Sequence, residues 1–350
     1  MFSTLRNLII RTQNRHFLEL VKFAELETLG RFASTYCYHH PSHVLVELTT
    51  RCNLRCQWCN QSNAAWQEKF GNRDMPFHLF EKIIPQLKGS RVILLYNIGE
   101  PLLYKNLFKA IRLARQYIPE VRITSNTTML TEEKARQLEE AGLTCLNVSI
   151  DSPRPELMKK IRGVDLSKVE ETLKMFGRTC SIPVETWTVI SQANIEDIKG
   201  LPDWASKFPA IKGLYFQLQN GVELGHKIGL PALNSLEKFQ ELQEIVESRC
   251  NKLGLKTNIR SLPYYQEGFH NKSAHGICKA PFTQLIAINV EGHLTPCCSY
   301  ATVNLGDVSK DGFKKTWNGP AMRAWRRSMI KQQYCQYCSE WCGYQTQRIS

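Results

Sequence analysis

The sequence predicts an α/β protein, a partial (β/α)6 TIM-like barrel followed by a small cysteine-rich α+β domain. Strand-like and helix-like segments alternate about six times over residues 41–221, which is typical of a parallel sheet covered by helices. This number of units predicts a barrel that is open on one side, where a substrate can enter. After residue 276 the alternation stops and six cysteines follow.

Two further segments complete the predicted organisation. Residues 1–40 are expected to form an N-terminal helical extension that packs across one end of the barrel. A membrane-surface helix or a precursor-binding extension is the alternative. Residues 222–276 are polar and helix-like, and we expect a connector. The cysteine-rich domain then takes residues 277–350.

The composition is that of a globular protein with an unusual number of cysteines. Of 350 residues, 43% are hydrophobic and 22% are charged, which suffices for one large domain and a small one. The 13 cysteines are clustered, and no apolar block of a secretory signal lies in residues 1–30. They therefore indicate metal ligands in a reducing compartment. We expect a cytoplasmic protein without a transmembrane helix.

The net charge of +13 would suit nucleic acid, phosphate or a membrane surface. However, the basic residues are spread along the chain, and none of their runs is interleaved with aromatic residues as in a strand-binding groove. The pattern favours a solvated basic surface and argues against nucleic acid as a partner.

A loop with three cysteines follows the first predicted strand, residues 43–49. Cys52, Cys56 and Cys59 have the spacing C-x3-C-x2-C, and the carboxyl ends of barrel strands are where such folds hold reactive groups. Three thiolates can each bind one iron of a [4Fe-4S] cube, which leaves one iron open. Structural zinc needs four ligands, so a triad without a nearby fourth argues against zinc.

At these residues the chain resembles the radical SAM superfamily, whose loop has this spacing and an aromatic residue before the last cysteine, here Trp58. The resemblance implies that S-adenosylmethionine (SAM) chelates the open iron and is cleaved by an electron to a 5′-deoxyadenosyl radical, which abstracts a hydrogen atom. The electron would come from an external donor such as flavodoxin or ferredoxin. A ferredoxin-like or accidental cysteine cluster is the alternative.

The strand that begins at Arg91 ends in Gly99, Glu100 and Pro101. This tripeptide is similar to the superfamily's GEP element, in which the glycine lets the backbone approach the methionyl amine of SAM and the glutamate accepts its hydrogen bonds. An ammonium group excluded from water needs such acceptors. The usual form has a second glycine where this chain has Ile98.

The remaining elements follow from hydrophobic periodicity. A capping box predicts a helix start at Thr131. We expect helices over residues 77–87, 107–117, 131–141 and 196–208, and strands over residues 91–98, 121–125, 144–151, 184–190 and 213–218.

Polar residues also follow these later strands. Ser125 and Asn126 resemble the T-x-N turn of relatives, which lies near the cofactor, and Ser191 is expected at a further edge of the adenosine pocket.

The end of the strand over residues 144–151 resembles the superfamily's S-[IL]-D-[GS] signature. The resemblance implies that Ser149 and Asp151 bind the ribose or position the substrate, and that Arg162 pairs with the methionine carboxylate. An ordinary helix cap or surface ion pair is the alternative for each of these polar residues.

Among the cysteines outside both clusters, we expect three to be buried packing residues: Cys145, Cys180 and Cys250. A thiol that faced the pocket could return a hydrogen atom to a substrate radical, as in epimerases of this superfamily. Cys250 is the candidate for that role.

The cysteine-rich domain resembles the SPASM or twitch domain over residues 278–345, with a hairpin turn at Glu291-Gly292. A full SPASM pattern holds two auxiliary clusters, and here the second cysteine set is truncated. The resemblance therefore implies one auxiliary [4Fe-4S] cluster, with Cys342 or Cys298 as a substitute ligand. A zinc knuckle is the alternative. The four expected ligands are Cys278, Cys297, Cys335 and Cys338.

These patterns predict a radical SAM enzyme that oxidises, epimerises or otherwise modifies a small carbohydrate-like metabolite. The missing leader-binding module favours a small substrate over a peptide or protein, although a peptide-modifying or sulfatase-type maturase remains the alternative. An alternative of another class is a non-catalytic iron–sulfur or zinc protein that binds nucleic acid. The pocket residues do not name the substrate.

Overall fold

The computed structural model describes residues 35–218, 236–262, 280–297, 303–331 and 333. Five of the predicted cluster cysteines lie outside the described residues: Cys278, Cys298, Cys335, Cys338 and Cys342. The same is true of residues 1–34 of the predicted extension. In the part that is described, no helix has the length and apolar character needed to cross a membrane.

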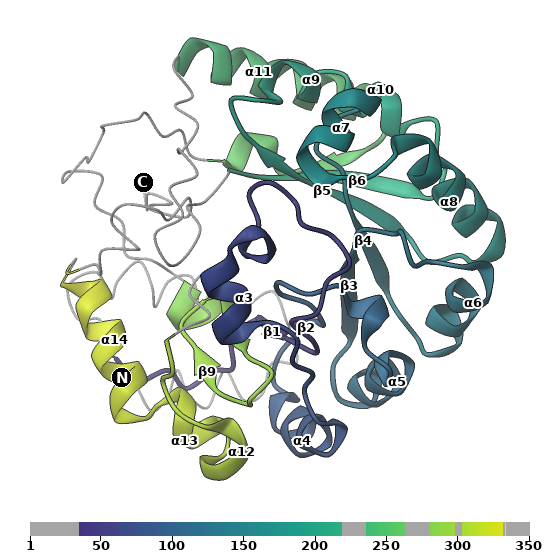
Figure 1. Cartoon of the computed structure of the whole chain (residues 1–350). Helices are drawn as coiled ribbons and strands as arrows, with labels where there is room; N and C mark the ends of the chain where they lie inside the picture. The colour runs from purple at the N-terminus through teal and green to yellow at the C-terminus, as the bar shows by residue number, and fades with distance from the viewer. Residues whose placement is uncertain (1–34, 219–235, 263–279, 298–302, 332, 334–350) are drawn as a thin grey trace, which may run out of the picture.

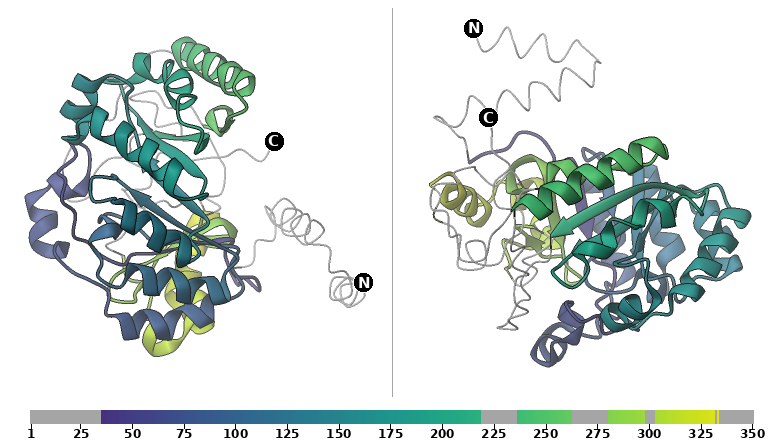
Figure 2. Two further views of the ribbon diagram at one scale, coloured as in Figure 1. Left: turned by 90° about the vertical axis from the view of Figure 1, so that its right-hand side faces the viewer. Right: turned by 90° about the horizontal axis from the view of Figure 1, so that it is seen from above.

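One curved sheet organises the described residues, with helices along its outer side (Figures 1 and 2). Its strand order is β7-β6-β5-β4-β3-β2-β1-β8-β9, and every neighbouring pair is parallel except β8 and β9. The strands are β1 (His43–Val46), β2 (Val92–Leu94), β3 (Glu120–Ser125), β4 (Cys145–Ser149), β5 (Val184–Ile190), β6 (Ile211–Leu218), β7 (Lys256–Thr257), β8 (Leu285–Ile288) and β9 (Leu294–Thr295).

The helices follow the strands in the order that the sequence predicts, and the α/β fold class is confirmed. Thr131 caps its helix by accepting a hydrogen bond from the backbone N–H of Lys134. The helices are α3 (Ala64–Phe70), α4 (Phe77–Ile83), α5 (Leu107–Tyr117), α6 (Glu132–Glu140), α7 (Pro155–Arg162), α8 (Leu166–Thr179), α9 (Ile195–Ile198), α10 (Leu201–Ala205), α11 (Leu236–Lys252), α12 (Val308–Asp311), α13 (Phe313–Trp317) and α14 (Pro320–Ile330).

Two predicted helices are interrupted. The helix expected over residues 196–208 is divided into α9 and α10. Gly200 lies between them, and Pro202 in the first turn of α10 has no N–H to continue a helical ladder from α9. The helix expected over residues 77–87 continues beyond α4 only as a 3-10 turn at Ile84–Leu87, which contains Pro85.

The two faces of the sheet differ in character. Burial alternates strictly along β3 and β5, and the outward side chains, such as Val121, Ile123 and Val184, are fully buried under the helices. The inward side chains of these strands are mostly polar and partly exposed. A closed parallel barrel fills its interior with apolar side chains, so this interior is suited to holding a polar molecule.

The described parts of the predicted connector and extension pack against the sheet and the C-terminal domain. In Figure 2, α11 lies along the sheet edge where β7 adds to β6, with Lys256 opposite Gly213. Residues 35–40 are not helical, in contrast to the prediction. They contact the C-terminal domain, where the Trp317 indole donates to the carbonyl oxygen of His39 at 2.9 Å.

The C-terminal domain is joined to the barrel through the sheet itself. Strand β8 pairs in parallel with β1 from His43 opposite Leu285 to Val46 opposite Ile288. The predicted hairpin turn is confirmed, with Gly292 at a φ of 82° between β8 and β9. The sequence does not predict that β8 extends the barrel sheet, because pairing between segments so far apart leaves no local signal.

The seam between β1 and β8 can be tested with Ile286→Ala, since Ile286 is fully buried. We expect the free energy of unfolding to fall by about 2–5 kcal/mol, from lost burial and the remaining cavity. Anaerobic urea titration measures this loss. Lys212→Ala on the exposed side of β6 is the control and should change stability by less than about 0.5 kcal/mol. Equal, small effects of both substitutions would contradict a packed seam.

Candidate active site

The three-cysteine loop connects β1 to α3 and is folded tightly by its own backbone. The N–H of Cys59 donates to the carbonyl oxygen of Cys56 at 3.0 Å, and the N–H of Ser62 donates to that of Cys59 at 2.9 Å. The Ser62 hydroxyl also donates to the carbonyl oxygen of Cys56 at 2.6 Å. These bonds bring the last two cysteines onto one turn.

The base of the loop is anchored by Asp74, which the sequence analysis did not single out. Its carboxylate accepts two bonds from Arg51, at 2.9 and 2.6 Å, and one from the Thr49 hydroxyl at 2.6 Å. The buried amide of Gln61 donates to the carbonyl oxygen of Thr50 at 2.8 Å. The loop therefore leaves β1 in a fixed direction.

The three thiols lie within electrostatic reach of one another. Burial raises the pKa of Cys52 to about 11 and that of Cys59 to about 12, and it also raises the pKa of Cys56. Because iron takes thiolates, these thiols release protons when they bind metal. Among the described residues no group of three or more His, Cys, Asp or Glu side chains is placed to hold a single metal ion. In a [4Fe-4S] cube each thiolate binds a different iron. The absence of a single-ion site among the described residues therefore does not argue against a cube.

Gly99 lets the turn that follows β2 approach the base of the cysteine loop. A Cβ at this position would collide with the carbonyl oxygen of Thr49 and lie 2.8 Å from that of Arg51. The neighbouring N–H of Glu100 donates to the carbonyl oxygen of Arg51 at 2.8 Å. This close approach is a structural reason for the glycine, and it adds to the methionyl contact that the resemblance implies.

The carboxylate of Glu100 is buried and joins three segments. It accepts bonds from the Ser125 hydroxyl and the Asn126 N–H, both at 2.8 Å, and from the Leu102 N–H at 3.1 Å. Burial raises the pKa of Glu100 to about 6, against the effect of these hydrogen bonds. The group is therefore mostly ionised at neutral pH and can accept hydrogen bonds from an ammonium group.

Asn126 continues this network to the cysteine loop. Its amide donates to the side-chain oxygen of Asn53 at 3.0 Å and lies 4.0 Å from the sulfur of Cys52. The next residue, Thr127, has a φ of 65°, which is strained for a β-branched residue. The predicted residues Gly99, Glu100, Ser125 and Asn126 are thus brought together beside the loop.

On the other side of the loop, Asp151 and Arg162 form an ion pair of 2.6 Å. Asp151 is fully buried, and its second oxygen accepts the N–H of Val189 at 2.8 Å. The end of α7 also contacts the loop, since Gln57 donates its N–H to the carbonyl oxygen of Ile161 at 2.8 Å. Arg162 is therefore paired with protein, and its predicted contact with the methionine carboxylate remains a prediction.

The other predicted residues differ in placement. Ser149 is partly exposed on the inner face at the end of β4, and Pro101 is buried in the turn after Glu100. Ser191 is buried, and its hydroxyl donates to the side-chain oxygen of Asn194 at 2.9 Å. The indole N–H of Trp58 is buried and has no hydrogen-bond partner among the described residues.

The structure does not support Cys250 as a hydrogen-atom donor. It lies on α11 with its side chain fully buried in the hydrophobic core, beside Thr257, and so does not lie on the inner face. Of the cysteines expected to be packing residues, Cys145 faces inward, from the start of β4. Of the four predicted auxiliary ligands, Cys297 is described, and it is partly buried just after β9.

Comparisons with known proteins agree with this geometry. Residues 46–201 match the model of the radical SAM superfamily, and residues 278–342 match that of the SPASM iron–sulfur cluster-binding domain. The chain belongs to the radical SAM superfamily and carries a C-terminal SPASM domain. It is an enzyme that uses a [4Fe-4S] cluster, SAM and an auxiliary iron–sulfur cluster, as the sequence predicted. Its loop thiols and the Glu100 network fit the first two of these groups.

The chain is similar to several named proteins. The GTP 3′,8-cyclase of Sulfurimonas denitrificans is 26% identical over 264 residues, which are 73% of this chain and 79% of that protein. The probable GTP 3′,8-cyclase of Thermococcus kodakarensis is 27% identical over 281 residues, 79% and 84% of the two chains.

Among solved structures, Streptococcus suis SuiB bound to S-adenosylmethionine has a TM-score of 0.66 at 17% identity, covering 96% of this chain and 80% of SuiB. BtrN in complex with AdoMet and 2-DOIA has a TM-score of 0.50 at 17% identity, covering 86% and 92%. These likenesses show the fold.

Gly99→Ala tests the close approach at the site. The added methyl group forces the turn after β2 away from the loop, and we expect SAM cleavage to fall by about 100-fold, as for a displacement of about 1 Å at a reacting centre. Formation of 5′-deoxyadenosine measures it. Gly200→Ala, whose methyl would make an ordinary contact of 3.5 Å, should retain activity, and similar losses in both variants would contradict the explanation.

Asp151→Asn tests the buried ion pair. It leaves the Arg162 cation without its partner, and we expect a loss of about 3–5 kcal/mol in the free energy of unfolding, with less iron bound by the loop. Urea titration and iron analysis measure the two effects. Glu132→Gln, in an exposed ion pair with Arg136, should leave both unchanged. An unchanged urea midpoint in Asp151→Asn would contradict the role of the pair.

Proposed function

We propose that this enzyme abstracts a hydrogen atom from a small, hydroxyl-rich, carbohydrate-like substrate held on the inner face of β3 to β6. The observation that carries the proposal is the polar character of that face. When bound, SAM and its cluster supply the 5′-deoxyadenosyl radical beside the cysteine loop, at the carboxyl ends of the same strands.

The inner face presents donors and acceptors in register. Thr124 lies opposite Asn147, and Asn147 lies opposite Glu185 on the next strand. Such a mixture of groups matches the hydroxyl groups of a sugar or cyclitol, each of which can donate and accept. Inward-facing polar and aromatic residues of these strands are Arg122, Thr124, Asn147, Ser149, Glu185, Trp187, Tyr215 and Gln217.

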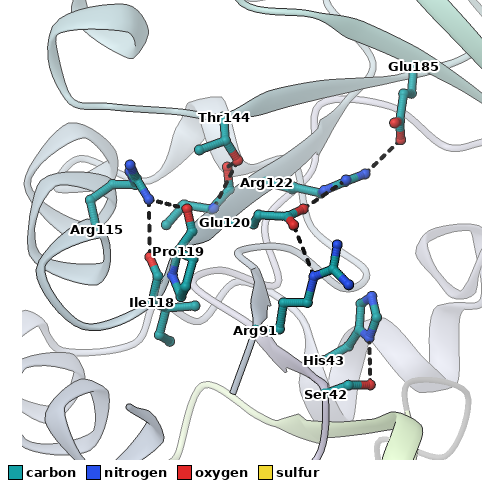
Figure 3. Close-up of polar contacts among 11 residues, drawn as sticks. Ser42, His43, Arg91, Arg115, Ile118, Pro119, Glu120, Arg122, Thr144 and Glu185 are labelled. Atoms are coloured by element: carbon teal, nitrogen blue, oxygen red, sulfur yellow. Dashed lines mark hydrogen bonds and ion pairs between the residues drawn. The ribbon is translucent and has the colours of Figure 1, made fainter. Parts of the chain in front are cut away.

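On this face one guanidinium is paired with two carboxylates. Figure 3 shows Arg122 between Glu185, at 2.7 Å, and Glu120, at 3.0 Å. The Arg122 Nε–H is buried without a hydrogen-bond partner in the described part of the chain. A polyanion would need several unpaired cations, whereas Arg122, on the described inner face of β3 to β6, is paired with two carboxylates. This pairing favours a neutral or amino-bearing polyol.

Two aromatic residues give this face a flat apolar surface. The rings of Trp187 and Tyr215 are stacked, with centroids 5.6 Å apart and planes at 17°. The negative faces of such rings attract C–H groups that carry partial positive charge. A sugar ring presents C–H groups on its faces and hydroxyl groups at its edge, so it can use both the aromatic and the polar parts of this surface.

A second candidate substrate is a guanine nucleotide. It is favoured by the likeness to proteins named GTP 3′,8-cyclase, which are 24–28% identical to this chain. The paired state of Arg122 argues against it. For either substrate we propose flavodoxin or ferredoxin as the electron donor and a reducing, cytoplasmic location, because the clusters need thiolates kept reduced.

The substrate class is tested with the anaerobically reconstituted enzyme, SAM and flavodoxin. Neutral sugars, amino-bearing cyclitols, GTP and peptides are supplied in turn, with deuterium on their C–H positions. We expect deuterium to enter 5′-deoxyadenosine from a sugar or cyclitol. Transfer from GTP or from a peptide alone would contradict the proposal.

With the polyol that transfers deuterium, Glu185→Gln should raise KM by about tenfold to a hundredfold, because a charged hydrogen bond contributes about 1.5–3 kcal/mol. The control Glu196→Gln, on the exposed side of α9, should keep the parent KM. Equal KM values in the two variants would place the substrate elsewhere.

A further inference from the structure

Gln61 is a buried polar side chain of the cysteine loop, and the sequence analysis gave it no role. It lies in the short 3-10 turn Asn60–Ser62, two residues after Cys59, and 2% of its surface is exposed. A glutamine amide carries donor hydrogens and an acceptor oxygen, and each is costly to bury without a partner. The partners of this amide therefore show what the side chain holds in place.

The amide of Gln61 connects two segments that are distant in the sequence. Its nitrogen donates to the carbonyl oxygen of Thr50, at the start of the cysteine loop, at 2.8 Å. The same nitrogen donates to the carbonyl oxygen of Ile98, in the turn after β2, at 3.3 Å. The amide oxygen accepts a hydrogen bond from the side chain of Gln67. Because both ends of the amide have protein partners, its orientation is fixed.

Gln61 also contacts a cluster ligand, and the segment that it holds is fixed from a second side. Its backbone N–H is hydrogen-bonded to the thiol of Cys59. The N–H of Ile98 donates to the buried carboxylate of Glu47 at 3.4 Å. Two buried side chains therefore hold the peptide groups on either side of Ile98, just before Gly99.

The separation between the cysteine loop and Glu100 matters for SAM. The resemblance implies that the methionyl amine binds the open iron and also donates hydrogen bonds at the Gly99-Glu100-Pro101 turn. Glu100 can accept from an amine on the cluster only if this turn and the thiols keep a fixed separation, because such hydrogen bonds span about 2.7–3.2 Å. A group that sets this separation acts on SAM binding without touching SAM.

We infer that Gln61 is a positioning residue for SAM, which fixes the Gly99-Glu100-Pro101 turn relative to the thiols of the cysteine loop. The inference goes beyond the proposed function and holds for any substrate. Loss of the Gln61 amide should weaken SAM binding and leave the three cluster ligands in place.

The chain contains a matched control for this test. Gln243 on α11 is likewise buried, and its amide nitrogen donates to the carbonyl oxygens of Ile259 and Leu262 at 2.7 and 3.3 Å. Replacing either glutamine with leucine keeps much of the side-chain volume and removes a donor from two carbonyl oxygens. We therefore expect Gln61→Leu and Gln243→Leu to lower the urea midpoint of unfolding by similar amounts.

SAM binding is measured on the full chain, reconstituted anaerobically and reduced, from the change in its EPR spectrum as SAM is added. We expect Gln61→Leu to keep the parent iron content and to raise the Kd for SAM about tenfold or more. Gln243→Leu should keep the parent Kd. Gln67→Leu keeps the Gln61 donors but removes the bond to the amide oxygen, so it should raise the Kd by a smaller factor.

Four results would overturn the inference. One is a parent Kd in an iron-loaded Gln61→Leu protein. Another is an equal rise of the Kd in Gln243→Leu, because a general loss of stability would then explain both. A third is loss of iron from a folded Gln61→Leu protein, which would show that the amide holds the cluster ligands and not the turn. If Gln61→Leu does not fold, a parent Kd in Gln67→Leu is the fourth.

Discussion

The hydrogen bonds around the buried carboxylate of Glu100 hold the candidate active site together. Its backbone N–H reaches Arg51 at the base of the cysteine loop, while its side chain binds Ser125 and the N–H of Asn126. Asn126 in turn contacts the loop at Asn53. The ends of three strands are thus fixed relative to the thiols. Because unpaired groups at this depth would be costly, the network favours one arrangement of the site.

The division of the sheet into two faces explains how stability and chemistry are combined in one element. The outer face is mostly apolar and is buried under the helices, and it provides free energy that holds the sheet together. The inner face is therefore free to carry Arg122, Glu185 and Asn147, which contribute polar contacts. The pairing of Arg122 with two carboxylates keeps that guanidinium compensated.

The C-terminal domain is part of the same structure as the barrel. Strand β8 lies next to β1, the strand that leads into the cysteine loop. Arg73, which follows α3, also pairs with Glu291 in the β8–β9 turn at 2.5 Å. Among the described residues, the segment around the three-cysteine loop is therefore tied to the C-terminal domain through the β1–β8 pairing and through this ion pair.

The sequence by itself determined the parts of this protein that depend on local pattern. The spacing of Cys52, Cys56 and Cys59, the Gly99-Glu100-Pro101 turn and the alternation of strands and helices each occupy one short segment, so each could be recognised without a structure. The tertiary structure decided what depends on contacts between distant segments. These are the pairing of β8 with β1, the partner of Arg162 and the burial of Cys250, because side-chain surroundings are set only when the chain is folded.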